Sequence, residues 1–394
     1  MAINFKNVYF CGFYCAVFLG MVQPYAKAYA TTRESIKEPS YVKFKPIPVF
    51  SIYQPVKKHG SADDALISGR VIPEFYAMAA PAKKQWRIAF LFPHIKDPYW
   101  VGCSFGVISE AKRLGIAVDI FPADGYNDLI GQLRMTDEAI AANYNAIVIS
   151  PISLTANNSS IHQARLMGIP VFELANDSTS DDLTIKVTTS LKNMGLDATH
   201  LVIDDAKKRG LKSINIALLP GPKNAGWVKG EVDGTLAAAK SASISVKIIA
   251  IKYGDSDRIE QTLLAEQLLV QYGKKIDYII GCTGCAPAAR LPIAQAGLTN
   301  KIRVIAYDLT HEIATLIKNK EIFAAADTKG VSQARVVTDA VVNYLEARVT
   351  KLPHTILVKL GQVDQSNVST YEFDTSIAPD GYLPILSYRP DGKH

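Results

Sequence analysis

Short apolar runs alternate with amphipathic stretches from Trp86 onward, and this alternation restricts the fold more than any other feature of the chain. Nine of the runs are rich in Val, Ile and Phe and nearly continuous in apolar residues, which is typical of strands buried on both faces. They span residues 86–92, 116–121, 145–150, 169–174, 213–219, 245–251, 277–280, 302–306 and 322–326. Strand–helix alternation predicts parallel sheets built from right-handed βαβ units, so the expected fold class is α/β.

The stretches between the predicted strands have helical spacing. Val107, Ala111 and Leu114 recur at i, i+4 and i+7 after the first strand. One sheet could hold all nine strands, but the pattern breaks near residue 188, where KVTT is followed by a long polar helical stretch. We therefore predict two smaller sheets. Ligands bind beyond the carboxyl ends of strands in open α/β sheets, so functional residues are expected directly after each strand.

The first thirty residues have the order of a secretory signal. Lys6 precedes an apolar run, Val8–Val22, and small residues follow it. This order predicts a signal peptide of residues 1–30, cleaved after Ala30 or Ala28. The alternative is a membrane anchor, but a spanning helix needs about 20 apolar residues, and this run is shorter.

Composition narrows the remaining classes. Loss of the signal would remove two lysines and lower the formal net charge from +6 to +4. The charge is spread along the chain without a basic run, so nucleic acid is not an expected partner. The remaining length suggests two or three domains. Residues 31–85 contain six prolines and little helical spacing, and we expect them to form an arm over the surface or to be partly disordered.

Aromatic, acidic and amide residues follow several of the predicted strands. The candidate ligand-binding residues are Asp97, Tyr99, Trp100, Tyr126, Asn224 and Asp308. Such a group suits a cleft for a small polar or cationic ligand, because an aromatic face attracts a cation by about 0.5–2 kcal/mol. The alternative is that the three aromatic residues only pack helix starts or the core.

Cys282 and Cys285 form the strongest enzyme-like motif. A C-x-x-C between a strand and a helix suits disulfide exchange, but a structural disulfide or two packed thiols would give the same spacing. With Cys103, the exported chain would keep three cysteines, hence at most one internal disulfide and one free thiol. A partner pair for zinc, a phosphate-loop spacing and a nucleophile elbow are missing from the sequence. We therefore predict no catalytic residue, metal site or cofactor.

Several segments resemble the TorT family of periplasmic binding proteins, which partner the TorS sensor histidine kinase in sensing trimethylamine N-oxide. They are LFPHIKDPYW, ALLPGPKNAGWVKGEVDG, IDYIIG, YDLTH and SYRP, between Trp86 and Pro390. The resemblance implies a periplasmic protein with a type I periplasmic binding protein fold, in which two doubly wound parallel-sheet lobes enclose a ligand cleft. It also implies three crossings between the lobes, near residues 188, 327 and 360. The first lobe would then hold 86–188 and 328–360, and the second 189–327 and 361–394.

Two positions depart from the family pattern. Leu191 and Asp308 stand where the resemblance leads us to expect a tryptophan and a tyrosine. Sugar-binding relatives of this fold use an aspartate after the same strand to hold hydroxyl groups. We therefore expect a cationic or polyhydroxylated ligand in preference to the amine oxide.

The resulting hypothesis is a binding protein without enzyme activity. It would close on a small polar ligand and present its ligand state to the periplasmic domain of a sensor histidine kinase. One alternative is a substrate-binding protein that serves the permease of a sugar-type ABC importer, with its ligand at Asp308. The other is a periplasmic thiol oxidoreductase that uses Cys282 and Cys285.

Overall fold

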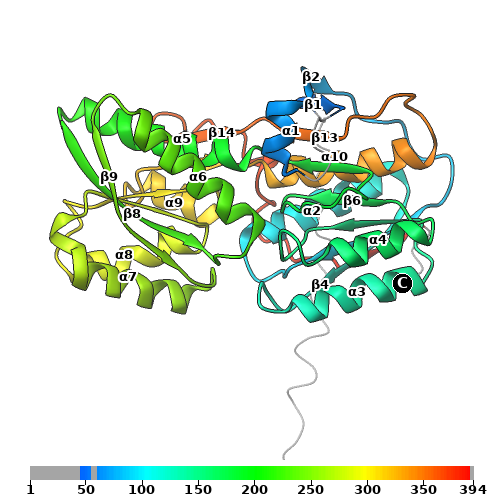
Figure 1. The fold of residues 1–394 in the computed structure, drawn as a ribbon, viewed down its shortest axis with the longest axis horizontal. Helices are drawn as coiled ribbons and strands as arrows, with labels where there is room; N and C mark the ends of the chain where they lie inside the picture. The colour runs from blue at the N-terminus through cyan, green and yellow to red at the C-terminus, as the bar shows by residue number, and fades with distance from the viewer. Residues whose placement is uncertain (1–44, 55–59, 391–394) are drawn as a thin grey trace, which may run out of the picture. The chain divides into compact units, whose positions relative to one another are not determined.

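A computed structural model describes residues 45–54 and 60–390. The predicted signal peptide and residues 31–44 of the predicted arm lie outside the described residues. The described residues form two α/β lobes, each around its own mainly parallel sheet (Figure 1). Each of the nine strands predicted from apolar runs is present, and the predicted division into two sheets is confirmed.

The first lobe has a nine-stranded sheet in the order β15-β4-β3-β5-β6-β7-β13-β1-β2. Six of its strands are parallel to one another: β3 (Arg87–Phe92), β4 (Ala117–Pro122), β5 (Ala146–Ile149), β6 (Val171–Leu174), β7 (Ile185–Thr188) and β13 (Thr355–Val358). Helices α2 (Pro98–Leu114) and α10 (Gly330–Leu345) pack on one face of the sheet. Helices α3 (Leu129–Ala141) and α4 (Asn158–Leu166) pack on the other. This is a doubly wound arrangement.

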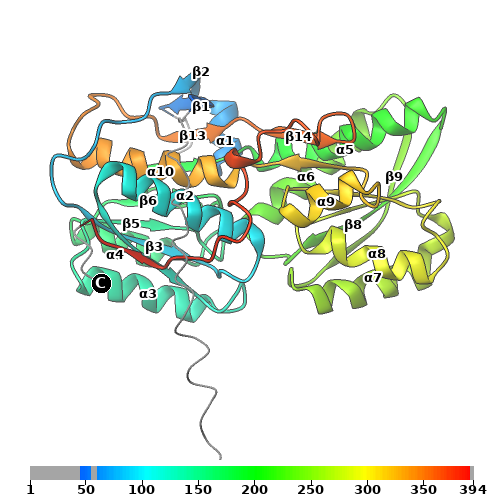
Figure 2. The ribbon, with the colours of Figure 1, turned by 180° about the vertical axis from the view of Figure 1, so that it is seen from behind.

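The second lobe repeats the same strand pattern in a six-stranded sheet, β14-β12-β11-β10-β8-β9. Its parallel strands are β8 (Ser213–Gly221), β9 (Ser245–Tyr253), β10 (Tyr278–Gly281), β11 (Arg303–Ala306) and β12 (Ala324–Asp327). The helices are α5 (Leu191–Lys208), α6 (Gly226–Ser241), α7 (Arg258–Tyr272), α8 (Cys285–Gln295) and α9 (His311–Lys318), with a 3-10 turn, η1 (Gly273–Lys275), after α7. Helices α7 and α8 lie together on one face of the sheet (Figure 2).

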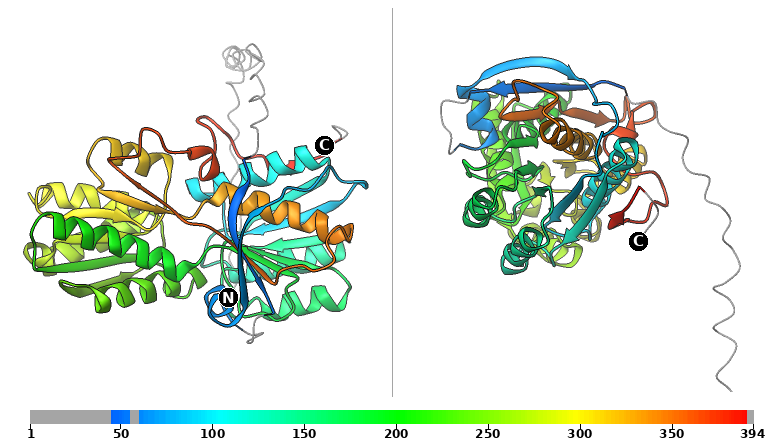
Figure 3. Two further views of the ribbon diagram at one scale, coloured as in Figure 1. Left: turned by 90° about the horizontal axis from the view of Figure 1, so that it is seen from above. Right: turned by 90° about the vertical axis from the view of Figure 1, so that its right-hand side faces the viewer.

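The N-terminal segment corrects the expectation of a surface arm. Strands β1 (Ile47–Tyr53) and β2 (Arg70–Tyr76), joined through helix α1 (Ala62–Ser68), extend the first-lobe sheet beyond β13 (Figure 3). β1 pairs antiparallel with β13, and its alternate residues are buried. The sequence analysis missed this period-2 pattern because it took the prolines as evidence against strands, whereas Pro48 and Pro73 both lie in paired strands.

The C-terminal segment returns to the first lobe, where the sequence analysis had assigned residues 361–394 to the second. The chain passes between the sheets four times, after β7, β12, β13 and β14. β14 (Gly361–Asp364) pairs with β12, and η2 (Phe373–Thr375) follows. The last strand, β15 (Ser387–Tyr388), then pairs with β4. Arg389 holds it there, because its guanidinium donates to both carboxylate oxygens of Asp119, at 2.8 and 2.9 Å.

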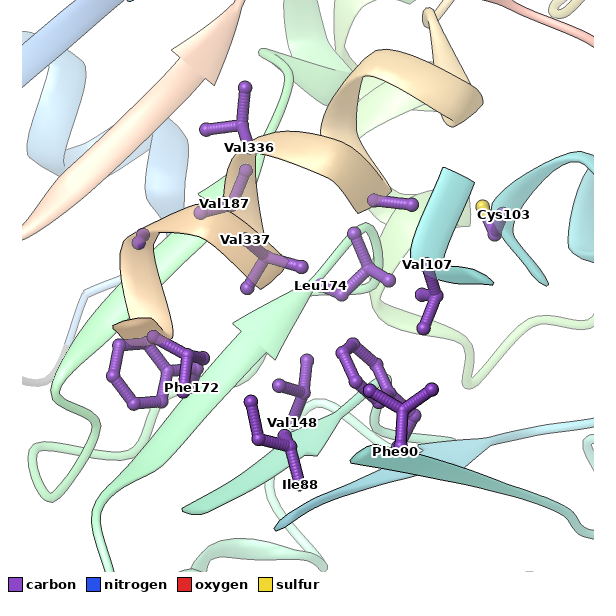
Figure 4. Close-up of a cluster of buried hydrophobic side chains, with 14 of the residues drawn as sticks. Ile88, Phe90, Cys103, Val107, Val148, Phe172, Leu174, Val187, Val336 and Val337 are labelled. Carbon is purple, nitrogen blue, oxygen red and sulfur yellow. The ribbon is translucent and has the colours of Figure 1, made fainter. Parts of the chain in front are cut away.

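The main first-lobe core lies between the sheet and helices α2 and α10 (Figure 4). Phe90, Val148 and Phe172 project from the strands and are fully buried. The two helices approach closely at Gly106, where a Cβ would lie 2.6 Å from the carbonyl oxygen of Val331. This close contact fixes α10, and with it the crossing that follows β12.

A fully buried lysine organises the end of the first-lobe sheet beside the crossing after β7. Lys186 in β7 donates to the Asp177 carboxylate at 2.8 Å and lies 3.6 Å from Glu173 in β6. Asp177 also accepts from the backbone N–H of Ala62 at 2.8 Å, which ties α1 to this cluster. One cation thus faces two carboxyl groups. Burial and the negative charge of Asp177 raise the pKa of Glu173 to about 8, although the charge of Lys186 opposes the shift.

We expect Glu173 to make the folded state less stable as the pH rises. Its folded pKa lies above its ordinary value of 4.5, so the folded state binds the proton more tightly. Its stabilising contribution is therefore present below about pH 4.5 and is lost towards about pH 8. Urea unfolding at pH values of about 5, 6.5 and 8 should show a smaller decline in the free energy of unfolding for Glu173→Gln than for wild type. The difference in slope is at most about 1.4 kcal/mol per pH unit.

The exposed residue Glu266 on α7 provides the matched control, and Glu266→Gln should keep the wild-type slope. Identical slopes for Glu173→Gln and wild type would show that Glu173 is ionised in the folded protein across this range.

Candidate functional site

A cavity lies between the two lobes, at the carboxyl ends of strands from both sheets. Its volume is about 60 Å³, which is room for roughly four to six water molecules at about 10–15 Å³ each. The lining residues are Asp97, Tyr99, Trp100, Tyr126, Ala175, Asn176, Thr189, Leu191, Met194, Trp227, Glu231, Ser256, Cys282, Thr283, Tyr307, Asp308, Thr328 and Gln333. These described lining residues include five aromatic rings and three carboxyl groups, but no Lys, Arg or His.

The start of helix α2 supplies the aromatic residues next to β3. Asp97 caps the helix, and its carboxylate accepts from the backbone N–H of Trp100 at 3.0 Å. The cap directs the first turn toward the cavity. The ring of Trp100 packs against Phe92 and Tyr99, with centroids 4.9 and 5.2 Å away, and the residue is only 2% exposed. Trp100 therefore both lines the cavity and belongs to the core, and the two interpretations from the sequence apply together.

Tyr126 connects the first lobe to the second. Its hydroxyl accepts from the side-chain amide of Asn176 at 3.3 Å, and Asn176 also donates to the carbonyl of Pro151 at 3.0 Å. On the other side its ring meets the edge of Trp227, at the start of α6, with centroids 6.0 Å apart. This aromatic contact crosses the cleft, so it depends on the closure of the lobes.

Asp308 follows β11 and is 8% exposed. Its Oδ1 accepts from the backbone N–H groups of Leu309 and Thr328, both at 2.8 Å, and its Oδ2 accepts from the Thr328 hydroxyl at 2.7 Å. These three hydrogen bonds favour the ionised form. Burial and the neighbouring carboxylate of Asp327 outweigh them and raise the pKa of Asp308 to about 7. The group is therefore balanced between its two protonation states near neutral pH.

Glu231 is a second carboxyl group in the second-lobe wall and is 2% exposed. It lies on α6, which packs so closely on α5 that a Cβ on Gly195 would collide with the Glu231 carbonyl oxygen. Among the described residues, Oε2 of Glu231 finds no hydrogen-bond partner. Burial, and then the charge of Asp308, raise the pKa of Glu231 well above its usual range.

Two further buried polar atoms in the lining residues lack partners. They are Nε1 of Trp227 and Oε1 of Gln333, again considering the described residues. The Gln333 amide is oriented by its other end, because Nε2 donates to the carbonyl of Thr328 at 2.6 Å. Most buried polar groups in native proteins are hydrogen-bonded, so three such atoms around one cavity are notable.

The C-x-x-C motif forms a disulfide between Cys282 and Cys285, and Cys103 is a buried free thiol. This agrees with the prediction of at most one disulfide and one free thiol. Cys282 is 2% exposed and Cys285 is fully buried. Reactive disulfides lie in partly exposed surroundings, so this environment favours the structural interpretation. The described residues contain no group of three or more His, Cys, Asp or Glu that could hold a metal ion.

Five of the six predicted site residues line the cavity, and the sixth does not. Asn224 is exposed in the turn before α6 and lies outside the lining set. The sequence analysis missed Glu231, Gln333 and Asn176. Glu231 and Gln333 lie inside helices, whereas the sequence analysis looked for site residues only directly after strands. A signal for Glu231 was present, because glycines at 226, 230 and 234 mark a helix face in close contact.

Comparison with known proteins gives the family. Residues 88–348 match the family model described as a periplasmic binding protein domain. Periplasmic protein TorT of Escherichia coli K12 is 26% identical over 310 residues, which cover 78% of this chain and 86% of TorT. The D-allose-binding periplasmic protein of the same organism is 27% identical over 261 residues, or 64% of this chain and 81% of that protein.

Comparison with solved structures supports the same fold. An ABC transporter solute binding protein from Bradyrhizobium sp. BTAi1, with bound bis-tris, superposes with a TM-score of 0.73 at 30% identity, covering 88% of this chain and all of that chain. The TorS sensor domain–TorT complex without ligand matches with a TM-score of 0.66 at 23% identity, over 77% of this chain and 100% of the matched chain, and supports the fold alone. None of the described helices has the length and apolar character needed to cross a bilayer. The chain belongs to the periplasmic binding protein domain family, with the type I fold that TorT and sugar-binding proteins share.

Proposed function

We propose that this chain is an exported periplasmic protein that closes on a small cationic ligand and presents its ligand state to a membrane sensor histidine kinase. The acidic and aromatic lining of the cavity is the observation that carries the proposal. Asp97, Glu231 and Asp308 face the same space without a basic side chain among the lining residues. Hydrogen bonds hold Asp97 and Asp308, and His94 lies 3.7 Å from Asp97, but Glu231 keeps one oxygen without a partner. A cation in the cavity would supply the missing opposite charge. Aromatic faces add attraction for the same charge.

Trimethylamine N-oxide fits this lining less well. It is net neutral, and its only hydrogen-bonding atom is an anionic oxygen that an ionised Asp308 would repel. TorT-like architecture supports the role as a sensor, whereas the side chains of this cavity support a different ligand. A small ligand also suits the cavity volume of about 60 Å³.

Uptake through an ABC importer is the second candidate. It rests on the Bradyrhizobium solute binding protein, which reaches 30% identity and was solved with bis-tris, an amine with several hydroxyl groups. That ligand has the chemistry that the acidic cavity of this chain would accept, so both candidates share one ligand class and differ in the partner. Thiol exchange is not carried forward, because both sulfur atoms of the disulfide belong to buried residues.

Replacing Asp308 with Asn should weaken the binding of a cation and spare a neutral ligand of the same shape. Trimethylammonium and trimethylamine N-oxide form such a pair, since an oxygen replaces one hydrogen. Calorimetry should show that Asp308→Asn lowers affinity for the cation by about tenfold or more, the order of magnitude of one buried charge-assisted interaction. The change for the amine oxide should be within about threefold.

Asp204→Asn is the matched control, because Asp204 lies on the exposed face of α5 with a side chain that is 65% exposed. It should leave both affinities unchanged. Tight binding of the amine oxide by wild type, unchanged or improved in Asp308→Asn, would contradict the proposed ligand class.

The affinity for the cation should rise with pH. The pKa of Asp308 is about 7 in the free protein, and the cation binds the ionised form, so binding releases a proton. Roughly one-tenth of this group is ionised at pH 6 and nine-tenths at pH 8, which predicts an increase of up to about tenfold in the association constant. Titrations with trimethylammonium, which stays protonated in this range, should show the increase in wild type. Asp308→Asn should reduce it, and an unchanged pH profile in that variant would assign the proton to another group.

The partner can be identified by crosslinking the tagged chain in its native bacterium, with and without the tightest-binding amine. We expect mass spectrometry to find a membrane histidine kinase whose crosslinking yield changes with the ligand. Capture of an ABC permease instead would support import and contradict the sensor role.

A further inference from the structure

Helix α6 presents two buried polar groups to the cavity from adjacent turns of the same face. Trp227 and Glu231 are separated by four residues, which places them one above the other on a helix. Both line the cavity. Among the described residues, Oε2 of Glu231 lacks a donor, and the indole Nε1 of Trp227 has no acceptor at normal hydrogen-bond distance, although the Tyr126 hydroxyl interacts with it weakly. A donor and, once the charge of a bound cation ionises Glu231, an acceptor are therefore available side by side.

Gln333 adds a second free acceptor from α10. It is 1% exposed, lines the cavity and uses its Nε2 to donate to the Thr328 carbonyl at 2.6 Å. Because that bond needs an N–H donor, it identifies Nε2, and the atom left without a partner is the carbonyl oxygen Oε1. Glu231 and Gln333 together form what we call the acceptor pair.

The acceptor pair requires hydrogen-bond donors from whatever fills the cavity. A buried acceptor that loses water without gaining a donor opposes binding. An ammonium that keeps an N–H brings both the charge for the carboxyl groups and a donor for the acceptor pair. A fully methylated ammonium brings the charge alone, and an amine oxide brings neither. A hydroxyl group on the same ligand could accept from the indole Nε1 of Trp227.

We propose that Glu231, Gln333 and Trp227 restrict the ligand to small protonated amines that keep at least one N–H, and that amino alcohols are the class that satisfies all three groups. This inference rests on the proposed function, because it assumes that the cavity binds a cation. It adds a selectivity that charge and aromatic contact do not provide, since both attract quaternary ammonium ions equally well.

The test uses four ligands of equal charge and falling N–H number: the protonated forms of ethanolamine, N-methylethanolamine and N,N-dimethylethanolamine, and choline. Calorimetry on the exported chain at one pH gives the four affinities. We expect a drop of at least about tenfold at the last step, from N,N-dimethylethanolamine to choline, where the final N–H is lost. Glu231→Gln should reduce that step to less than about threefold, because it removes the charge of the acceptor and keeps its shape.

Size is controlled within the same experiment, because a purely steric penalty for the added methyl group would persist in Glu231→Gln. The exposed Glu266→Gln serves as the matched charge control and should retain the full step. Equal or tighter binding of choline by wild type, or an unchanged step in Glu231→Gln, would overturn the inference while leaving the proposed cationic ligand intact. Failure of all four cations to bind wild type would overturn the proposed function as well.

A second variant keeps the inference testable if Glu231→Gln does not fold. Trp227→Phe retains a ring and removes the indole donor. The comparison is between protonated N,N-dimethylethanolamine and N,N-dimethylpropylamine, in which a methyl group replaces the hydroxyl. Wild type should prefer the hydroxylated ligand by about threefold or more, and Trp227→Phe should lose this preference. A preference that survives in the variant would remove Trp227 from the proposal.

Discussion

The hydrogen bonds around Asp308 join the ligand cavity to a crossing between the lobes. Asp308 follows β11 in the second lobe, while Thr328, which donates to it twice, lies between β12 and α10, where the chain enters the first lobe. The next carboxylate, Asp327, accepts from Tyr371 and Ser376 of the C-terminal segment, both at 2.6 Å. A change in charge at Asp308 therefore acts directly on one chain segment that connects the lobes and, through the neighbouring carboxylate of Asp327, on a second. This coupling gives a ligand a physical route to the relative position of the lobes.

The crossing after β7 has its own support from the N-terminal segment. Asp63 in α1 accepts from the Ser190 hydroxyl at 2.5 Å and from the backbone N–H of Lys192 at 2.9 Å, at the start of α5. The buried Lys186 cluster holds α1 in place on the first-lobe side. The N-terminal segment thus packs where the chain enters the second lobe. Closure must either preserve these contacts or break them, so they contribute to the balance between open and closed forms.

Local patterns predicted nine of the parallel strands, because these are short and apolar and most of them are followed by a helix, but they missed β7 and β13. They also located Asp97, Tyr99 and Asp308, since strand ends are positions that the chain order specifies. The remaining parts depend on distant partners. Lys186 is stable in the interior because Asp177 contacts it directly and Glu173 lies opposite it in β6, and nothing near residue 186 in the sequence indicates these pairings. The two-residue strand β15 likewise exists only because β4 offers an open edge. Glu231 is buried by helix packing, which strand-end rules do not describe.

The cavity keeps its aromatic character even though the second lobe lacks aromatic residues at the two positions where the TorT resemblance predicts them. Leu191 and Asp308 do line it, but Trp227 and Tyr307 supply rings from the same lobe. Tyr307 is fully buried and held by a hydrogen bond of 2.8 Å between its hydroxyl and that of Thr235. The cavity therefore keeps aromatic walls on both sides and gains acidic groups.

Under the proposed function, these acidic groups make closure of the lobes depend on the ligand. Closing an empty cleft takes Asp308 and Glu231 out of water together, and their mutual repulsion raises the pKa of Glu231 still further. The closed form without ligand must then either bind protons or bear the unfavourable burial of unpaired charge. A cation removes that penalty only when the lobes close around it, so it binds the closed form better than the open one. Differential affinity of this kind is what a ligand needs to shift a conformational equilibrium, and under the proposed function it arises from the same carboxyl groups that we propose select the ligand.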